Sequence, residues 1–133
     1  MQFFAAEWHM PHDKRTHSTA PSAITPTGPV RIHPVDYRAA RAAADLRAML
    51  DLYARDPMGG GEALDADVLG RLCGDLATRA DAFSFLAYVD VPKPQAVGLI
   101  NCFEGYSTFK ARPLLNVHDI VVRPDYRGAG VGQ

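Results

Sequence analysis

The sequence predicts an α+β domain, an α/β sandwich with a mainly antiparallel sheet and two N-terminal helices, in the order β-α-α-β-β-β. Two segments of the first half repeat apolar residues every three or four positions, which is typical of amphipathic helices. In the second half, three apolar and aromatic segments follow one another with only turns and loops between them, which favours strands paired as hairpins. A chain of 133 residues has room for one domain.

The composition argues against several kinds of partner. Fourteen basic and fifteen acidic residues give a net charge of -1, so no broad basic surface is expected for nucleic acid or an anionic membrane. No run approaches the roughly 20 apolar residues of a membrane-spanning helix, and the first residues do not resemble a secretory signal. Cys73 and Cys102 fit neither a CxxC metal pair nor a redox pair. We therefore expect a cytoplasmic protein without nucleic-acid or membrane partners.

Residues 1–29 are expected to form a disordered leader. Most of this segment is rich in proline, threonine, serine and histidine and shows no apolar period, so it lacks the residues that build a core. His9, His12 and His17 lie in it, but nothing in the pattern fixes their geometry, and we expect no metal site. The folded domain is expected to span residues 30–133.

The domain is expected to begin with a short strand and a helix. Residues 30–33 alternate apolar and polar side chains, as a strand does. Asp36 stands where a helix N-cap belongs, and an apolar stripe over residues 39–53 predicts the helix behind it. A proline and three glycines at positions 59–61 end this helix. We interpret the glycines as a linker, with a mobile substrate loop as the alternative.

A second helix is expected over residues 65–79, where apolar residues again form one stripe. Gly70 and Gly74 lie one turn apart in this helix, and each weakens it by roughly 1 kcal/mol relative to alanine. Close packing against a neighbouring element is the reason we expect for them.

Three strands are expected in the second half. Residues 83–89 and 96–103 are joined by a turn whose two prolines forbid a continued ladder, so they are interpreted as an antiparallel hairpin. A longer connection over residues 105–113 leads to a third strand at residues 114–122. From residue 117 onward this strand would present a long apolar edge with unpaired backbone groups.

The segment from Ile120 to Gln133 carries the functional prediction. An apolar strand runs into a Pro124-Asp125 turn and then into alternating glycines. Glycine lets successive backbone N–H groups turn toward one point and approach a ligand closely, and such a nest of donors suits a phosphate or pyrophosphate. A Walker loop or a dinucleotide-binding fingerprint would need other residues and spacings. A plain hairpin turn is the remaining alternative, but it does not explain the residues that precede the glycines.

Residues 121–132 resemble motif A of the GNAT superfamily of N-acetyltransferases. The motif reads R/Q-x-x-G-x-G/A after a Pro-acid-aromatic turn, and Arg127, Gly130 and Gly132 occupy its defining positions. The resemblance implies acetyl-CoA as the acyl donor and a primary amine, on a small molecule or a peptide, as the acceptor. It implies that the end of the last strand pairs with the pantetheine arm and that the amides of the loop surround the pyrophosphate. The implied cofactor-binding residues are Ile120, Val121, Val122, Arg127, Gly128, Ala129, Gly130, Val131, Gly132 and Gln133.

In the family, a long helix and a fifth strand follow this loop. Measured against that pattern, residues 30–133 are expected to be an incomplete, truncated GNAT domain that is poorly stable and inactive or impaired as an enzyme. The alternative is a non-catalytic pseudoenzyme, or a fragment that assembles with a separate C-terminal half. A homodimer is a further option for its assembly.

Three residues are candidates for the general base that the resemblance implies. They are Glu104 at the end of one strand, and His118 and Asp119 inside the next. A carboxylate or imidazole near the thioester could take the proton of the amine. Neighbouring residues of a strand face opposite sides, so His118 and Asp119 can share a cleft only at a bulge. The alternatives are that Glu104 caps a loop and that His118 or Asp119 bonds to the backbone at a bulge or faces solvent. Packing is the expected role of Tyr53, Met58 and Tyr106, with an acceptor pocket as the alternative.

Overall fold

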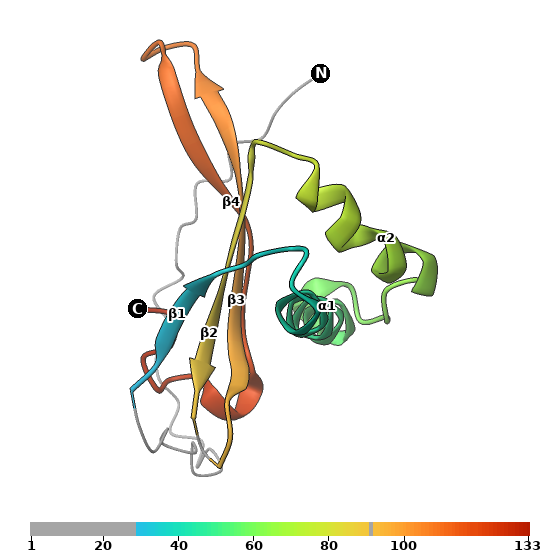
Figure 1. The fold of residues 1–133 in the computed structure, drawn as a ribbon. Coiled ribbons are helices and arrows are strands. Elements are labelled where there is room, and N and C mark those ends of the chain that lie inside the picture. Colours follow the sequence, from blue (N-terminus) through green and yellow to red (C-terminus); the bar gives the residue numbers. More distant parts are fainter. Residues whose placement is uncertain (1–28, 91) are drawn as a thin grey trace.

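The computed structural model describes residues 29–90 and 92–133. Two helices cover one face of a four-stranded antiparallel sheet with the strand order β1-β2-β3-β4 (Figure 1). This arrangement confirms the predicted fold class and element order, while nearly all of the expected leader lies outside the described residues. The elements are β1 (Arg31–Pro34), α1 (Ala40–Arg55), the 3-10 turn η1 (Pro57–Gly59), α2 (Ala66–Ala77), β2 (Ala82–Val89), β3 (Gln95–Ser107), β4 (Arg112–Val122) and the 3-10 turn η2 (Pro124–Tyr126).

The start of α1 differs from the prediction. Asp36 does not cap this helix, because its carboxylate accepts the amide of Arg38 at 2.9 Å and its carbonyl accepts the amide of Ala39 at 3.1 Å. These bonds close a turn of the kind that aspartate favours by bonding its own backbone two residues on. The helix therefore begins at Ala40, after a residue without a side-chain cap.

The second helix begins as predicted. Asp65 is its N-cap, and its carboxylate accepts the amide of Asp67 at 2.8 Å. The reason expected for the two helix glycines is wrong, because a Cβ atom at Gly70 or Gly74 would meet no atom within 4 Å. Both glycines face open space, so packing does not require them.

The connection expected over residues 105–113 is largely strand. β3 continues to Ser107 and β4 begins at Arg112, with Tyr106 opposite Pro113 in the register. Proline is tolerated here because β4 is an edge strand among the described residues. The two strands form a long hairpin that projects beyond the rest of the sheet (Figure 1).

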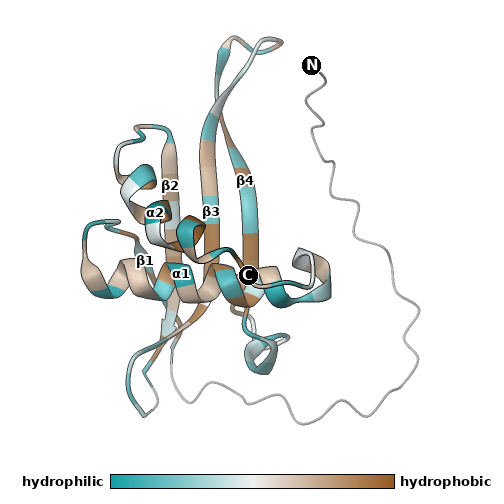
Figure 2. Ribbon diagram, turned by 90° about the vertical axis from the view of Figure 1, so that its right-hand side faces the viewer, coloured by the Kyte–Doolittle hydropathy of each residue, from teal (hydrophilic) through white to brown (hydrophobic). Residues whose placement is uncertain are grey.

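The sheet carries apolar clusters on both faces. Between the sheet and the helices lies the larger cluster, centred on the fully buried Leu46 and Leu86. On the opposite face a smaller cluster joins Val97 of β3 to Tyr126 of η2. Figure 2 shows α1 crossing the strands, with hydrophobic residues concentrated in the parts of β3 and β4 that it covers. The segment after β4 therefore packs, through Tyr126, on the face of the sheet that the helices do not cover.

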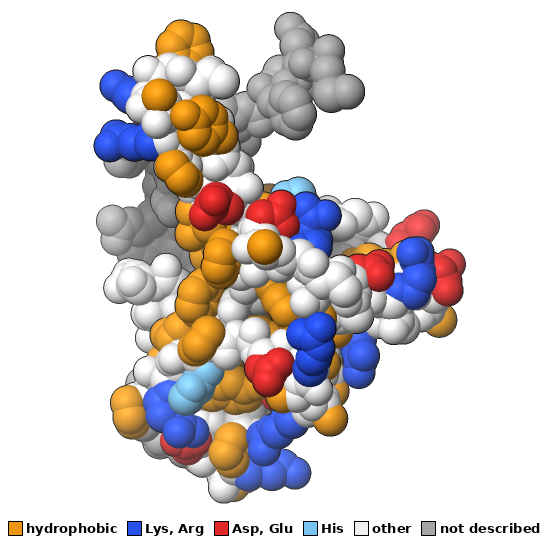
Figure 3. Space-filling model, turned by 45° about the horizontal axis from the view of Figure 1, so that its top comes forward, with side chains coloured by type: hydrophobic (Ala, Val, Ile, Leu, Met, Phe, Trp, Pro, Cys, Tyr) orange, Lys and Arg blue, Asp and Glu red, His pale blue; other side chains and the backbone are white. Residues whose placement is uncertain are grey.

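The expected apolar edge is present on β4. Leu115 and Val117 are each 56% exposed, and Ile120 is 49% exposed. Figure 3 shows hydrophobic side chains gathered along the projecting hairpin and down the sheet beside it. Within the two described ranges, no helix is long and apolar enough to cross a membrane.

Candidate active site

The loop after β4 has the backbone of an anion-binding nest. Gly128 and Gly130 adopt φ angles of 80° and 85°, in the left-handed region. The residues that follow each of them, Ala129 and Val131, keep negative φ. Alternation of left-handed and ordinary residues turns successive amides toward one side, which makes a concave site for phosphate oxygens.

Most amides of this loop are free to bind a ligand. Only two are used internally: the amide of Ala129 donates to the Tyr126 carbonyl at 3.3 Å, and that of Gln133 donates to the Gly130 carbonyl at 3.2 Å. The other four, from Gly128, Gly130, Val131 and Gly132, have no partner among the described residues. They border a hollow of about 250 Å³. The lining of this hollow includes no acidic side chain, so the set of amide donors fits a phosphate or pyrophosphate group.

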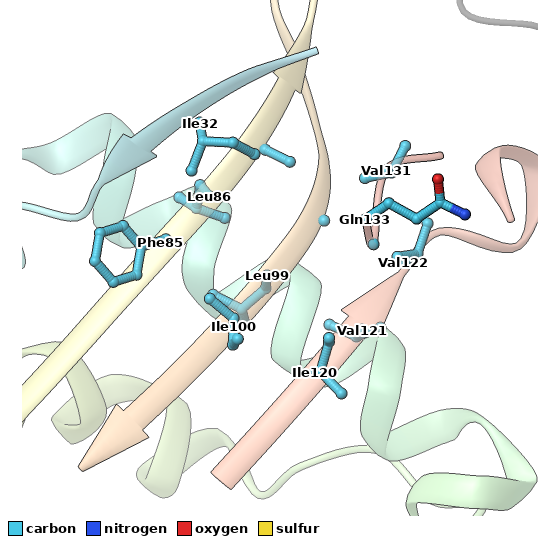
Figure 4. Close-up of a pocket in the computed structure, with 13 residues that line it drawn as sticks. Ile32, Phe85, Leu86, Leu99, Ile100, Ile120, Val121, Val122, Val131 and Gln133 are labelled. Carbon is cyan, nitrogen blue, oxygen red and sulfur yellow. The ribbon is translucent and has the colours of Figure 1, made fainter. Parts of the chain in front are cut away.

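Close packing fixes the loop on the sheet. Tyr126 is only 8% exposed and belongs to the smaller cluster, against which Val131 also packs. Gly98 of β3 makes room for this contact, because a Cβ atom there would lie 3.1 Å from Cγ1 of Val131. Figure 4 shows Val131 and Gln133 beside Val122, at the end of β4.

Arg127 ties the loop to the linker between the helices. Its Nε donates to the Val122 carbonyl at 3.1 Å, and its Nη2 lies 3.0 Å from the Asp56 carboxylate. Hydrogen bonds from the Met58 amide and, to a smaller extent, from Arg127 hold the pKa of Asp56 below its ordinary value. The structure thus gives the Arg127 guanidinium protein partners rather than an open position in the nest. Nothing in the sequence pairs Asp56 with a residue 71 positions away.

The apolar residues before the loop lie on both faces of the sheet. Val121 belongs to the larger cluster, Val122 packs against the smaller one, and Ile120 is half exposed. Ile120 and Val122 border an apolar depression of about 200 Å³ on the face opposite the helices (Figure 4). β4 pairs only with β3 in the described part of the chain, so its outer backbone groups are accessible for pairing.

A second cavity, of about 350 Å³, opens on the helix side of the sheet. Of the three residues considered for an acceptor pocket, Tyr53 lines it, whereas Met58 and Tyr106 are 80% and 61% exposed and do not. Gly59 also lines it, in a linker closed by hydrogen bonds to Ala54 and Asp56, which favours the linker interpretation of the glycine run. The lining residues are Leu50, Tyr53, Ala54, Gly59, Leu64, Leu72, Leu76, Asn101, Phe103, His118 and Asp119.

A β-bulge brings two of the three base candidates together. Asp119 pairs with Asn101 and Val117 pairs with Cys102, so His118 is an extra residue in β4. A bulge lets two neighbouring residues face the same side of the sheet. Accordingly, both His118 and Asp119 line the helix-side cavity. Glu104 is exposed and does not line this cavity.

A chain of side-chain hydrogen bonds crosses the sheet and ends at Asp119. Tyr37 bonds the hydroxyl of Ser84 at 2.9 Å, Ser84 donates to Asn101 Oδ1 at 2.6 Å, and Asn101 Nδ2 donates to Asp119 Oδ2 at 2.9 Å. Ser84 has one proton, which it gives to Asn101, so Tyr37 is the donor at the far end. Asp119 Oδ1 has no partner among the described residues. These hydrogen bonds fix Oδ2 of the Asp119 carboxylate and leave Oδ1 for a ligand.

Sequence reasoning did not identify the residues whose hydrogen bonds lead to Asp119, namely Tyr37, Ser84 and Asn101. Ser84 and Asn101 are 4% and 5% exposed, within otherwise apolar strands. Buried polar side chains need partners, so their presence inside β2 and β3 was the available signal. Which residues they bond could not be read from the sequence, because the partners lie on three different strands and a turn.

His118 is positioned by aromatic packing. Its ring meets the Phe103 ring edge to face, with centroids 5.3 Å apart, and the Arg79 guanidinium lies 5.6 Å from the centroid of Phe103. Across residues 29–90 and 92–133, no three His, Cys, Asp or Glu side chains are placed to hold a metal ion.

Comparisons with solved structures show the same fold. A ribosomal-protein-alanine N-acetyltransferase from Brucella melitensis biovar Abortus 2308 matches with a TM-score of 0.57 and 21% identity, over 78% of this chain and 63% of that one. An aminoglycoside 6'-N-acetyltransferase from Acinetobacter baumannii gives a TM-score of 0.58 and 23% identity, over 78% and 64% of the two chains. The aminoglycoside acetyltransferase AAC(6')-Iy, in complex with a CoA-linked bisubstrate analogue, gives 0.62 and 16% identity over 79% and 65%. The chain thus spans less than two thirds of the length of each.

Sequence comparisons agree with the motif. No curated protein matches the chain. The family model described as "Acetyltransferase (GNAT) family" matches residues 46–133, which include α2, the whole sheet except β1, and the glycine loop. This match extends over more than half of the chain, so the protein belongs to the GNAT family of acetyltransferases.

Proposed function

We propose that this protein is an acetyl-CoA-dependent N-acetyltransferase that transfers the acetyl group to a primary amine. The proposal is carried by the nest of four amides that have no partner in the described part of the chain. The nest directly follows β4, the strand on which Asp119 also lies. Asp119 stands three residues before Val122, about 10 Å along a strand that rises about 3.3 Å per residue. A ligand held at the loop and running along β4 would therefore reach the carboxylate.

The loop residues would hold the donor through backbone groups. The amides of Gly128, Gly130, Val131 and Gly132 would bind the pyrophosphate. The outer backbone groups of residues 120–122 would pair with the pantetheine arm of acetyl-CoA. Arg127 would keep the loop in place through Val122 and Asp56. When bound, acetyl-CoA would supply an acetyl thioester that a neutral amine can attack.

Asp119 would serve as the general base. An amine must lose a proton before or during attack, and a carboxylate within hydrogen-bond reach can accept it. Asn101 holds Oδ2, so Oδ1 is the oxygen that would take the proton. His118 borders the same cavity and is the second candidate; Glu104 is not carried into this proposal because it is exposed and outside the cavity.

The comparisons support the reaction class without defining the acceptor. The similar structures are named as enzymes that acetylate a ribosomal protein alanine or aminoglycosides. A cytoplasmic location, a homodimer, a complementing C-terminal fragment, and the low stability and impaired activity expected of this chain stay predictions.

The nest is tested by comparing two glycine substitutions. Gly130→Glu places a carboxylate beside the phosphate site and is expected to weaken acetyl-CoA binding at least about 100-fold by calorimetry, because like charges repel at close range. Gly61→Glu is the matched control: Gly61 has a left-handed φ of 80°, close to the 85° of Gly130, and open space around it, but lies in the helix linker. Unchanged binding by Gly130→Glu, or equal losses in both variants, would reject the assignment of the loop.

A further inference from the structure

The helix-side cavity has an apolar wall and a polar end. Leucine, alanine and aromatic side chains from α1, the linker and α2 form most of its lining. The polar side chains, Asn101, His118 and Asp119, all come from β3 and β4. Its volume of about 350 Å³ lies at the small end of the range of about 300–1,000 Å³ that is usual for small-molecule sites.

Asp119 is the one carboxylate that lines this cavity in the described part of the chain. Its Oδ1 atom is without a protein partner there, whereas Asn101 occupies Oδ2. The cavity therefore offers a single negatively charged position to a ligand. His118 is turned edge to face against Phe103 and adds no negative charge.

Two carboxylates at the end of α1 and the start of the linker are already paired. Asp51 accepts Arg55 Nε and the Leu64 amide, both at 2.8 Å, and these bonds lower its pKa. Asp56 accepts Arg127 and the Met58 amide. A second cation in a ligand would have to break one of these pairs to bind either carboxylate, and a cation that is buried in the cavity without a partner is costly.

From this distribution of charge we infer that the acceptor is a compact amine with one positive charge on an apolar body, such as an arylalkyl or alkyl monoamine. The inference rests on the proposed function and specifies its acceptor. The ammonium would lie at Asp119 Oδ1, and the apolar body would lie against Leu72, Leu76 and Tyr53. Polyamines and aminoglycosides would be rejected because the cavity leaves their additional charges unpaired.

The acceptor class is tested by direct binding and by turnover. Phenethylamine and the polycations spermidine and kanamycin are titrated into the protein by calorimetry, and kcat/KM is measured with acetyl-CoA by following thiol release. Phenethylamine is expected to bind at least 10-fold more tightly, and to have a kcat/KM at least 100-fold higher, than either polycation. Tighter binding or faster turnover of a polycation would overturn the inference.

A matched pair of variants tests whether the apolar lining of the helix-side cavity excludes ligands with a second positive charge. Leu72→Asp adds a second carboxylate to the cavity. It is expected to lower the ratio of kcat/KM for phenethylamine to kcat/KM for spermidine at least 10-fold. Leu69→Asp makes the same change on α2 outside the lining and should leave the preference as it was. Equal effects of the two variants, with both folded by circular dichroism, would overturn the inference.

The test separates the two proposals. If acetyl-CoA fails to bind, the proposed function fails, and amine binding by calorimetry still decides the acceptor class. If acetyl-CoA binds but phenethylamine does not bind better than the polycations, the acceptor inference alone is wrong.

Discussion

At the scale of single residues, hydrogen bonds fix the position of the Asp119 carboxylate. Tyr37, Ser84 and Asn101 form a directed chain of donors, so the amide group of Asn101 presents its NH2 to the carboxylate. A base that is fixed through one oxygen can present the other in a constant position. The bulge at His118 brings the imidazole to the side of β4 on which the carboxylate lies.

Replacing this carboxylate tests its role. Asp119→Asn is expected to lower kcat by about 100- to 10,000-fold, the usual contribution of a general base. Acetyl-CoA affinity should stay unchanged, because the nest does not include this residue. Glu104→Gln removes an exposed carboxylate and should change kcat less than twofold. Steady-state kinetics and calorimetry measure both effects, and a larger loss in Glu104→Gln would refute the choice of base.

Tyr88 gives a residue-scale prediction for alkaline pH. Burial, together with its hydrogen bond to Asp45 at 2.8 Å, raises the pKa of Tyr88 from 10.0 to about 12. The folded state therefore keeps the phenol proton between pH 10 and 12, where the unfolded state loses it. The stability that this proton contributes is complete below pH 10 and is lost as the pH rises toward 12.

Urea denaturation at a series of pH values measures this loss. The unfolding midpoint of the unaltered protein should fall more steeply between pH 10 and 12 than that of Tyr88→Phe, which has no phenol to titrate at this position. Parallel pH profiles for the two proteins would show that Tyr88 makes no such contribution.

At the scale of elements, the glycines differ in what surrounds them. Gly70 and Gly74 have open space where a Cβ atom would stand, whereas a Cβ atom at Gly59 would lie 1.9 Å from the Tyr53 carbonyl oxygen. Gly59 lets the linker turn back against the end of α1. The helix glycines have no such steric reason.

Alanine substitutions should therefore act in opposite directions. Gly70→Ala and Gly74→Ala are each expected to stabilise the protein by up to about 1 kcal/mol, because alanine is the better helix former. Gly59→Ala should destabilise it, since backbone atoms would have to move. Chemical denaturation measures all three, and a loss of stability in both helix variants would contradict this account of α2.

At the scale of the whole molecule, β4 presents an exposed apolar edge. Leu115, Val117 and Ile120 are each about half exposed on a strand that pairs on one side only among the described residues. Exposed strand edges of this kind are templates for pairing with other chains. We therefore expect this chain to self-associate as its concentration rises.

A lysine in the edge should suppress association. Val117→Lys is expected to shift the sedimentation profile toward monomer, because charged residues block edge-to-edge pairing. Val68→Lys makes the same change at an exposed position on α2 and should leave association unchanged. A monomeric unaltered chain at all concentrations, or equal effects of both variants, would contradict the role of the edge.

Particular residues show how far sequence reasoning reached. The start of the second helix, the apolar stripes of both helices and the element order followed from local rules and were confirmed. Asp36 and the residues around Tyr106 were misassigned. In the first case a side-chain bond formed a turn instead of a cap; in the second, pairing with β4 extended a strand through a segment with weak β character.

The sequence by itself was enough to predict the family, which the family model confirms, and a phosphate site in the glycine loop, which stays a prediction. A glycine pattern and its preceding turn are local features, so their spacing along the chain was enough to predict a phosphate site. The tertiary structure alone decided which base candidate has a fixed carboxylate and that Arg127 pairs with Asp56. It also decided that, in the described part of the chain, Asp119 is the one carboxylate that lines the helix-side cavity. These facts depend on contacts between residues far apart in the chain, and such contacts leave no periodicity or motif from which they could be read.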